Sequence, residues 1–310
     1  MNMEEKQGET TFKNSLGKAG IVTIIGRPSA GKSTFLNTAS GEKISIVSPV
    51  PQTTRNALRG IVNTSFGQLV FVDTPGYHDS EKKLNKKLKE VTQEQLVTSD
   101  ALLYILDATR IPGPEEILTA ALVKPHIDKT IIALNKIDLP TANVSEGINF
   151  LKQVFPEISE NRIFQISAEK DTNINDVLKA LYQIIPQGEP LYPEEFYTDQ
   201  EVDFRIAEII REQAINRLYD EIPHAIYVDI SDMEWRREGK ELWVRAFLCV
   251  ERESQKGMVI GKGASMIKTI RIESIKQLRK IFSYRIDLDL QVKVNKNWRQ
   301  KDVVLNRVLK

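Results

Sequence analysis

Gly26-Arg27-Pro28-Ser29-Ala30-Gly31-Lys32-Ser33-Thr34, or GRPSAGKST, is the stretch that decides the fold of this chain. It follows the apolar run 21–25 and precedes a stretch with the pattern of a helix. Two glycines separated by four residues and followed by Lys-Ser have the spacing of a phosphate-binding loop, in which backbone amides point at phosphate oxygens. We expect Lys32 to reach the terminal phosphates and the Ser33 hydroxyl to bind Mg²⁺ at the positive end of the helix. The pattern predicts a nucleoside triphosphate site to which all nine residues contribute.

The composition allows two globular domains. The chain has 310 residues, of which 41% are hydrophobic and 27% charged. Its single cysteine, Cys249, lies in an apolar run, which favours a packing role in a reducing compartment. His78, His126 and His224 do not have the spacing of metal ligands. The N-terminal sequence lacks the pattern of a signal peptide and no apolar run approaches the length of a membrane span, so we predict a cytoplasmic protein, which we expect to be a monomer.

The charge is distributed unevenly along the chain. Residues 254–310 contain 14 basic and 4 acidic residues, whereas residues 1–200 contain 21 basic and 25 acidic residues. A local excess of this size favours binding to a polyanion, although a solvated basic face has the same composition.

Apolar runs alternate with helix-like stretches over the first half of the chain. The runs lie at 21–25, 69–72, 101–106, 130–134 and 163–166. This alternation is typical of a parallel sheet covered on both faces, an α/β fold, with 58–64 as an antiparallel edge strand that turns through 65–67 into the run 69–72. Ligands bind such sheets at the ends of the strands.

Two polar motifs are expected to complete the triphosphate site. In Gln52-Thr53-Thr54-Arg55 we favour Thr54 over Thr53 as the residue that binds Mg²⁺ and the γ-phosphate. In Asp73-Thr74-Pro75-Gly76 the carboxylate can bind Mg²⁺ through its water shell, and the Gly76 amide can approach the γ-phosphate. We therefore predict Ser33, Thr54 and Asp73 as metal-binding residues. The residues expected to act on the γ-phosphate are Lys32, Thr54 and Gly76.

Asn135-Lys136-Ile137-Asp138 selects the base. The two oxygens of Asp138 can accept both donors on the edge of guanine, and adenine has no such pair, so GTP is favoured over ATP. Asn135 can bridge to the phosphate loop, and the stem of Lys136 can cover the base. The amide of Ala168, in Ser167-Ala168-Glu169, would support the base.

The order GRPSAGKS, QTTR, DTPG, NKID and SAE, from Gly26 to Glu169, resembles the translation-factor-related small GTPases. The resemblance implies a Ras-like α/β fold that hydrolyses GTP to GDP. Tyr77 follows DTPG at a position where many GTPases carry a glutamine that orients water, so we predict slow unassisted turnover. Ser29 stands where potassium-activated relatives carry asparagine, which argues against activation by a monovalent cation.

A change in composition after Pro186 marks the boundary between two domains. We predict a disordered tail at 1–18, a nucleotide-binding domain at 19–186, a linker at 187–200, an RNA-binding domain at 201–300 and an extension at 301–310. Tyr192 and Phe196 are expected to pack the linker against a domain. In the second domain we expect helices at 204–219 and 266–282, strands at 225–231, 242–250 and 288–294, and a loop at 254–264, which together make a smaller α+β unit.

The stretch Met258-Val259-Ile260-Gly261-Lys262-Gly263-Ala264-Ser265-Met266-Ile267 resembles the K-homology RNA-binding motif of type II domains. In such domains a glycine-flanked basic loop clamps the backbone of single-stranded RNA. Ala264 replaces the second glycine of the family, and a basic loop that only packs is the competing interpretation. The resemblance implies that RNA is contacted by Val259, Ile260, Gly261, Lys262, Gly263, Ala264, Ile267, Lys268 and Arg271.

The two domains together resemble the bacterial ribosome-associated GTPases, as do the phrases at 51–55, 207–212 and 292–299. The resemblance implies GTP-dependent binding to small-subunit ribosomal RNA near its 3′ end, a role in assembly and maturation of that subunit, and peripheral contact with the inner membrane. A constitutive RNA-binding protein with a structural nucleotide pocket is the main alternative. A GTPase of tRNA modification or membrane transport would be expected to carry an extra domain or spanning helices.

Overall fold

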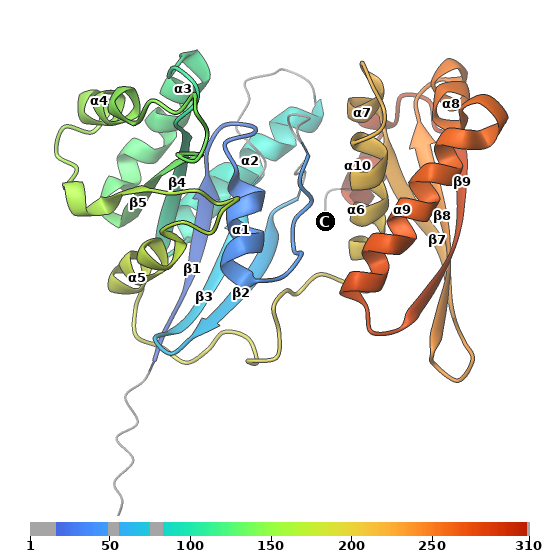
Figure 1. Ribbon diagram of the computed structural model, residues 1–310, viewed down its shortest axis with the longest axis horizontal. Coiled ribbons are helices and arrows are strands. Elements are labelled where there is room, and N and C mark those ends of the chain that lie inside the picture. Colours follow the sequence, from blue (N-terminus) through green and yellow to red (C-terminus); the bar gives the residue numbers. More distant parts are fainter. Residues whose placement is uncertain (1–16, 49–55, 75–82, 309–310) are drawn as a thin grey trace, which may run out of the picture.

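The computed structural model describes residues 17–48, 56–74 and 83–308. They form two units side by side, each built on its own sheet (Figure 1). The predicted tail falls outside the described residues except at its end, where Lys18 already belongs to the first strand. We call residues 17–184 the N-terminal unit and residues 202–308 the C-terminal unit.

The N-terminal unit is a six-stranded sheet in the order β2-β3-β1-β4-β5-β6. Its strands are β1 (Lys18–Ile25), β2 (Leu58–Thr64), β3 (Gly67–Asp73), β4 (Ala101–Asp107), β5 (Thr130–Asn135) and β6 (Ile163–Gln165). Its helices are α1 (Lys32–Ser40), α2 (Lys83–Thr98), α3 (Pro114–Val123), α4 (Val144–Val154) and α5 (Ile174–Ile184). All pairs are parallel except β2 with β3, so the parallel sheet and its antiparallel edge strand are confirmed.

Helices cover both faces of this sheet, as its apolar strands require (Figure 1). Side chains of α1 and α5 pack on one face, around Phe35 and Leu181. Side chains of α2, α3 and α4 pack on the other, around Tyr104 and Leu151. Sheets of this kind bind ligands at the carboxyl ends of the parallel strands, where the loop between β1 and α1 lies.

The C-terminal unit is a three-stranded sheet with most of its helices packed on one face and the last helix on the other. The strands are β7 (Tyr227–Arg236), β8 (Glu241–Val250) and β9 (Arg285–Val294), with β7 antiparallel and β9 parallel to β8. The helices are α6 (Val202–Ile215), α7 (Ile222–Ala225), α8 (Glu253–Ile260), α9 (Ser265–Ile281) and α10 (Asp302–Val308). The α+β unit predicted from the sequence is confirmed.

One element of this unit was predicted wrongly. The sequence led us to expect a loop over 254–264, but α8 occupies most of it. Gly257 and the absence of an apolar stripe argued against a helix there. The Gln255 side chain, which accepts the amides of Glu251 and Arg252 at 3.0 Å, caps the start of α8, and Val259 packs its end into the core.

Residues 187–200 run along the outer edge of β2. The Ile61 amide donates to the Tyr197 carbonyl at 2.9 Å, and Gln68 accepts the amides of Leu191 and Tyr192 at 2.8 and 2.9 Å. This segment therefore covers the exposed edge of the sheet. Tyr197 packs against the core, whereas Phe196 is exposed. The exact domain borders stay a prediction.

In the part of the chain that the structure describes, no helix combines the length and the apolar character needed to cross a bilayer. The same residues contain no group of histidine, cysteine or acidic side chains placed to bind a metal on their own. Cys249 is buried beside Trp298, as a packing role requires.

Replacing Trp298 should destabilise the C-terminal unit. The side chain is fully buried, packs against the Tyr227 ring and donates to the Ala225 carbonyl at 2.8 Å, so Trp298→Ala should cost about 3–5 kcal/mol of unfolding free energy. Trp235 is 54% exposed, and Trp235→Ala should cost about 1 kcal/mol. Urea unfolding measures both variants. If the two variants lost the same unfolding free energy, the contacts of Trp298, in the turn before α10, would not be important for the stability of this unit.

Candidate nucleotide site and nucleic-acid surface

The loop between β1 and α1 is a tight bend held by its own lysine. Lys32 Nζ donates to the carbonyls of Gly26 at 2.9 Å and Arg27 at 3.1 Å. Burial lowers the pKa of the Lys32 amine, and the charges of Asp73 and Glu116 offset part of that shift. The loop thus holds a buried cation facing its own backbone, the arrangement expected of a phosphate site.

The two glycines of the loop lie where a side chain would collide with its neighbours. A Cβ on Gly26 would come 2.4 Å from the Ile105 carbonyl oxygen. Gly31 has φ 101°, and a Cβ there would come 2.2 Å from Asn135 Nδ2. The loop is therefore pressed against the ends of β4 and β5, which explains why its spacing requires glycine.

A serine pair converges on Asp73 at the end of β3. Ser33 Oγ and Ser45 Oγ donate to the same oxygen of Asp73, at 2.7 and 2.8 Å, and Asp73 is fully buried. Mg²⁺ prefers oxygen ligands, so the hydroxyl of Ser33 and the carboxylate of Asp73 fit its chemistry. Ser45 was missed by the sequence analysis, because one serine in the run 43–47 carries no motif.

Asn135 joins three of the predicted motifs. Its Nδ2 donates to the Ala30 carbonyl at 2.9 Å, and its Oδ1 accepts the Ala168 amide at 2.9 Å. The predicted bridge from Asn135 to the phosphate loop is therefore present in the structure. The Ala168 amide faces Asn135, and its predicted support of the base stays a prediction.

Lys136 lies next along the chain and forms an ion pair that the sequence analysis missed. Its Nζ lies 2.7 Å from Asp107 Oδ2 at the end of β4. Burial raises the pKa of the Asp107 carboxyl, but hydrogen bonds from Lys136 and Thr109 outweigh it, so the net shift is downward. The sequence did contain a signal for Asp107, because a carboxylate at the end of a predicted strand lies where such sheets bind ligands. The ion pair fixes Lys136 beside the exposed Asp138.

A buried ion pair supports the phosphate loop from α3. Arg27 Nε lies 3.1 Å from Glu116 Oε2, and Tyr104 Oη donates to Glu116 Oε1 at 2.5 Å. Burial raises the pKa of Glu116, and the hydrogen bond from Tyr104 and the charge of Arg27 oppose that shift. Arg27 therefore reaches into the protein and fixes the loop.

Several predicted site residues lie outside the described residues, so their roles stay predictions. They are Thr54, Pro75, Gly76 and Tyr77. Among the described ones, Thr74 donates to the Ile24 carbonyl at 2.8 Å and is buried. Pro28, Ser29 and Thr34 are partly exposed in the loop, Ser167 is buried, and Glu169 is exposed.

The loop before α9 has the backbone of a glycine clamp. Gly261 has φ 72° and ψ 169°, a region that is essentially restricted to glycine. Gly263 and Ala264 have φ 61° and 60°, so Ala264 adopts the left-handed conformation in place of the family's glycine. The loop geometry is therefore kept at the cost of a strained alanine.

The residues predicted to bind RNA are not equally available. Lys262 and Lys268 are exposed. Arg271 is half-buried, donates to the Leu288 carbonyl, and lies 3.7 Å from Asp287. The prediction for Val259 is wrong. This residue lies near the end of α8, and its side chain is fully buried in the core, so it cannot contact a ligand at the surface.

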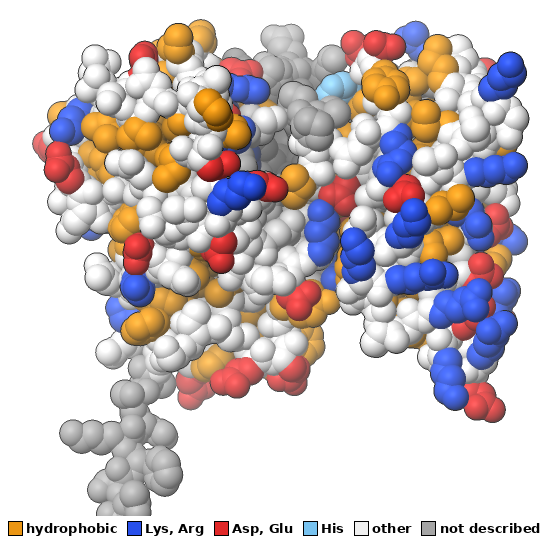
Figure 2. All heavy atoms as spheres, viewed as in Figure 1, with side chains coloured by type: hydrophobic (Ala, Val, Ile, Leu, Met, Phe, Trp, Pro, Cys, Tyr) orange, Lys and Arg blue, Asp and Glu red, His pale blue; other side chains and the backbone are white. Residues whose placement is uncertain are grey.

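Basic side chains gather on the C-terminal unit. Figure 2 shows lysine and arginine spread over this unit, at the right of the view, whereas the N-terminal unit shows mixed charges and apolar patches. The exposed cations on α9 and the loop before it are Lys262, Lys268, Lys276, Arg279 and Lys280. The charge excess of the sequence thus forms a basic surface that extends from the glycine loop along α9.

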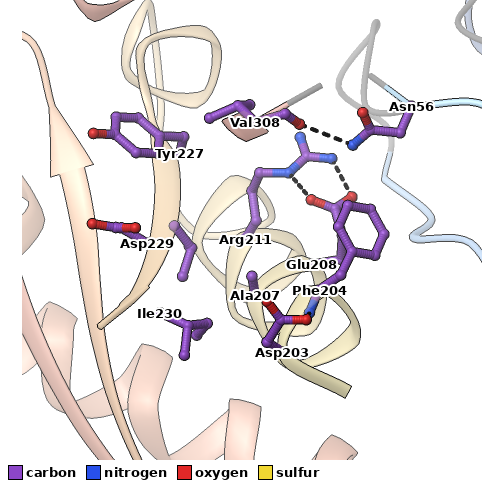
Figure 3. Close-up of a pocket in the computed structure, with 11 residues that line it drawn as sticks. Asn56, Asp203, Phe204, Ala207, Glu208, Arg211, Tyr227, Asp229, Ile230 and Val308 are labelled. Carbon is purple, nitrogen blue, oxygen red and sulfur yellow. Dashed lines mark hydrogen bonds and ion pairs between the residues drawn. The ribbon is translucent and has the colours of Figure 1, made fainter. Parts of the chain in front are cut away.

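The two units meet at a small cavity of about 110 Å³ (Figure 3). Asn56 reaches it from the N-terminal unit, and its Nδ2 donates to the Val308 carbonyl of α10 at 3.0 Å. Arg211 and Glu208 of α6 pair beside it, with Nε–Oε1 at 2.7 Å. Helix α10 therefore contacts the chain just before β2.

Two family models match the chain. A model described as a 50S ribosome-binding GTPase matches residues 21–136, and a model described as a KH domain matches residues 221–299.

Curated relatives match the chain over both units. A GTPase Era from Treponema denticola is 60% identical over 290 residues, which is 94% of this chain and 99% of the relative. A GTPase Era from Treponema pallidum is 44% identical over 94% of this chain and 97% of the relative.

Two solved structures have the same architecture. An Aquifex aeolicus Era variant bound to GDP·AlF4⁻ aligns with a TM-score of 0.88 at 32% identity, over 94% of this chain and 98% of that one. Era in complex with MgGDPNP and nucleotides 1506–1542 of 16S ribosomal RNA aligns with a TM-score of 0.89 at 33% identity, with the same coverage.

Replacing Asn135 should weaken the folded state even without a ligand. Asn135→Ala leaves the buried Ala30 carbonyl and Ala168 amide without this partner, which should cost about 2–3 kcal/mol of unfolding free energy. Urea unfolding of nucleotide-free protein measures the loss. Asn63 is exposed and donates to the Glu194 carbonyl, and Asn63→Ala should cost less than about 1 kcal/mol. A loss at Asn135 as small as that at Asn63 would contradict its role as a junction.

Proposed function

Because this chain belongs to the Era family of GTPases, we propose that it is a GTP-dependent switch that binds small-subunit ribosomal RNA through its KH domain. The observation that carries the proposal is that one chain contains both a nucleotide site and a surface suited to RNA. A phosphate loop with a buried lysine lies in the N-terminal unit, and a glycine loop within a basic surface lies in the C-terminal unit.

GTP would be held by the groups at the carboxyl ends of β1, β3 and β5. Lys32 supplies a positive charge next to the loop amides, where phosphate oxygens would lie. Asp138 is exposed at the end of β5, next to the fixed Lys136, and can accept the guanine donors. We propose the same nucleotide-binding and catalytic residues that the sequence predicted, and these include Thr54 and Gly76.

Mg²⁺ would be held by Ser33 and Asp73, with Thr54 as a further ligand. A bound Mg²⁺ neutralises charge on the β- and γ-phosphates. The 2.7 Å contact between the Ser33 hydroxyl and Asp73 keeps both oxygens at one point beside the phosphate loop. The solved Era complex with MgGDPNP supports this use of the metal.

The RNA partner is proposed from the relatives and from the basic surface. The solved Era complex contains nucleotides 1506–1542 of 16S ribosomal RNA, which supports a partner in the small subunit. The family model that mentions the 50S subunit covers only residues 21–136, whereas this relative aligns over both units. Lys262 and Lys268 are the exposed cations best placed to meet the RNA backbone next to Gly261.

We further propose slow intrinsic hydrolysis, a cytoplasmic location and peripheral membrane contact. Tyr77 in place of a water-orienting glutamine supports the slow rate. The location and the membrane contact rest on the family resemblance alone.

RNA affinity should depend on the nucleotide. A short single-stranded segment from the 3′ end of 16S ribosomal RNA should bind about tenfold more tightly with a non-hydrolysable GTP analogue than with GDP, a typical coupling between two sites. Filter binding measures both affinities. Lys32→Ala should abolish the difference but keep RNA binding, because the contacts of Lys32 with the loop and with the expected phosphates lie in the N-terminal unit.

Equal RNA affinity with both nucleotides in the unaltered protein would overturn the switch and favour the constitutive RNA-binding alternative. GTP turnover that is present in the unaltered protein and lost in Lys32→Ala would exclude a purely structural nucleotide pocket. Circular dichroism of Lys32→Ala provides the folding control.

Gly261 and Ala264 should respond differently to substitution. A Cβ on Gly261 would come 2.8 Å from Met266 Cβ, in a conformation that alanine avoids, so Gly261→Ala should cost about 2 kcal/mol and weaken RNA binding more than tenfold. Ala264→Gly relieves the left-handed strain but frees the unfolded chain, so stability should change by less than about 1 kcal/mol and RNA affinity should hold or rise.

Thermal unfolding and filter binding of the two variants measure these effects. Loss of RNA binding in Ala264→Gly would show that the methyl group of Ala264 is itself part of the RNA contact.

A further inference from the structure

Residues 43–47, which we call the strap, connect the two units by alternating contacts. Ile44 packs into the core of the N-terminal unit, and Ile46 packs into the core of the C-terminal unit. The strap lies between α1, which carries the phosphate loop lysine, and the stretch that contains Thr54. One short segment thus belongs to both hydrophobic cores.

On the nucleotide side the strap is fixed by Asn37 and Asp73. Asn37 Oδ1 accepts the amides of Ile44 and Ser45 at 2.9 Å, and Asn37 Nδ2 donates to the Ser45 carbonyl at 2.8 Å. Ser45 Oγ then donates to Asp73 Oδ2 at 2.8 Å. The Ser45 hydroxyl is therefore one of the groups that set the orientation of the Asp73 carboxylate.

On the RNA-binding side the strap is fixed by Glu212 of α6. Its Oε1 accepts Lys43 Nζ at 2.6 Å and the Val47 amide at 2.7 Å. The Glu212 side chain is only 6% exposed, so these charge-assisted hydrogen bonds are shielded from water. The two donors lie two residues before and two residues after Ser45, so the carboxylate binds the strap on both sides of that serine.

We propose that Glu212, a residue of the C-terminal unit, is a positioning residue of the magnesium site in the N-terminal unit. It holds the strap so that Ser45 keeps the Asp73 carboxylate in the orientation that suits Mg²⁺. The inference rests on the proposed assignment of Ser33 and Asp73 to Mg²⁺. Hydrogen-bond partners of metal-binding carboxylates typically change metal affinity by about 10–100-fold when they are lost.

Reciprocity gives the contact a regulatory consequence. If the position of α6 changes the affinity for Mg²⁺, then Mg²⁺ and its nucleotide change the equilibrium position of α6 by the same factor. RNA bound to the KH domain can therefore act on the nucleotide site through Glu212, although no KH residue has to touch the nucleotide.

The test is the Mg²⁺ dependence of GDP release in the full chain. Release of a fluorescent GDP is followed at increasing Mg²⁺ concentrations in the unaltered protein and in Glu212→Gln. The Mg²⁺ concentration that gives half of the slowing should rise about three- to tenfold in the variant, less than for a direct partner of the ligand. In EDTA the two release rates should agree, because the phosphate loop is unaltered.

Glu208→Gln is the matched control. It removes one carboxylate charge from the same helix, where Glu208 pairs with Arg211, and it should leave the Mg²⁺ dependence unchanged. Ser45→Ala should raise the same Mg²⁺ concentration further than Glu212→Gln does, because Ser45 is the direct partner of Asp73. The double variant should shift no further than Ser45→Ala, because both act through one contact.

The outcomes separate this inference from the function that it rests on. Asp73→Asn should remove the Mg²⁺ dependence, and if it does not, the proposed magnesium site is wrong. If Asp73→Asn acts and Glu212→Gln matches the unaltered protein, only the role of Glu212 is overturned. Should Glu212→Gln not fold, Lys43→Met removes one of the two donors from a partly exposed position, and its shift or lack of one decides the question.

Discussion

The structure depends on the need to satisfy one buried carboxylate oxygen. Asp73 lies fully buried at the end of β3, and a buried charge is tolerated only when it is hydrogen-bonded. Ser33 and Ser45 supply hydroxyls to the same oxygen, one from the helix after the phosphate loop and one from the strap. The loop, the strap and β3 are therefore placed relative to one another by a single acceptor.

The parallel sheet brings the remaining site residues to the same edge. β1, β4 and β5 are parallel neighbours, so the phosphate loop, Asp107 and Asn135 emerge side by side. Asn135 donates a hydrogen bond to the loop at Ala30, and Arg27 of the loop forms an ion pair with Glu116 of α3. The loop is thus held from two sides before any ligand binds, which is the preorganisation that tight nucleotide binding requires.

The sequence was sufficient to predict the elements that have a periodic pattern or a known motif. It was not sufficient to predict contacts between residues that show neither signal. The strand runs and the spacing GRPSAGKS were sufficient for the six-stranded sheet and for the placement of Asn135 and Asp73. Helix α8 was missed because it contains Gly257, a residue type that disfavours a helix, and because its cap is a side-chain contact from Gln255. Ser45, Glu116 and Glu212 were missed because each is a lone polar residue whose partner lies far away in the chain.

Two contacts between the units lie, in the sequence, just before and just after the stretch that carries Thr54. Val47, just before residues 49–55, donates its amide to Glu212 of α6, and Asn56, directly after them, donates its side chain to Val308 of α10. Both contacts end on the C-terminal unit. The C-terminal unit therefore contacts the chain directly before and directly after the segment expected to sense the γ-phosphate, so each of the two separate cores is connected to that segment.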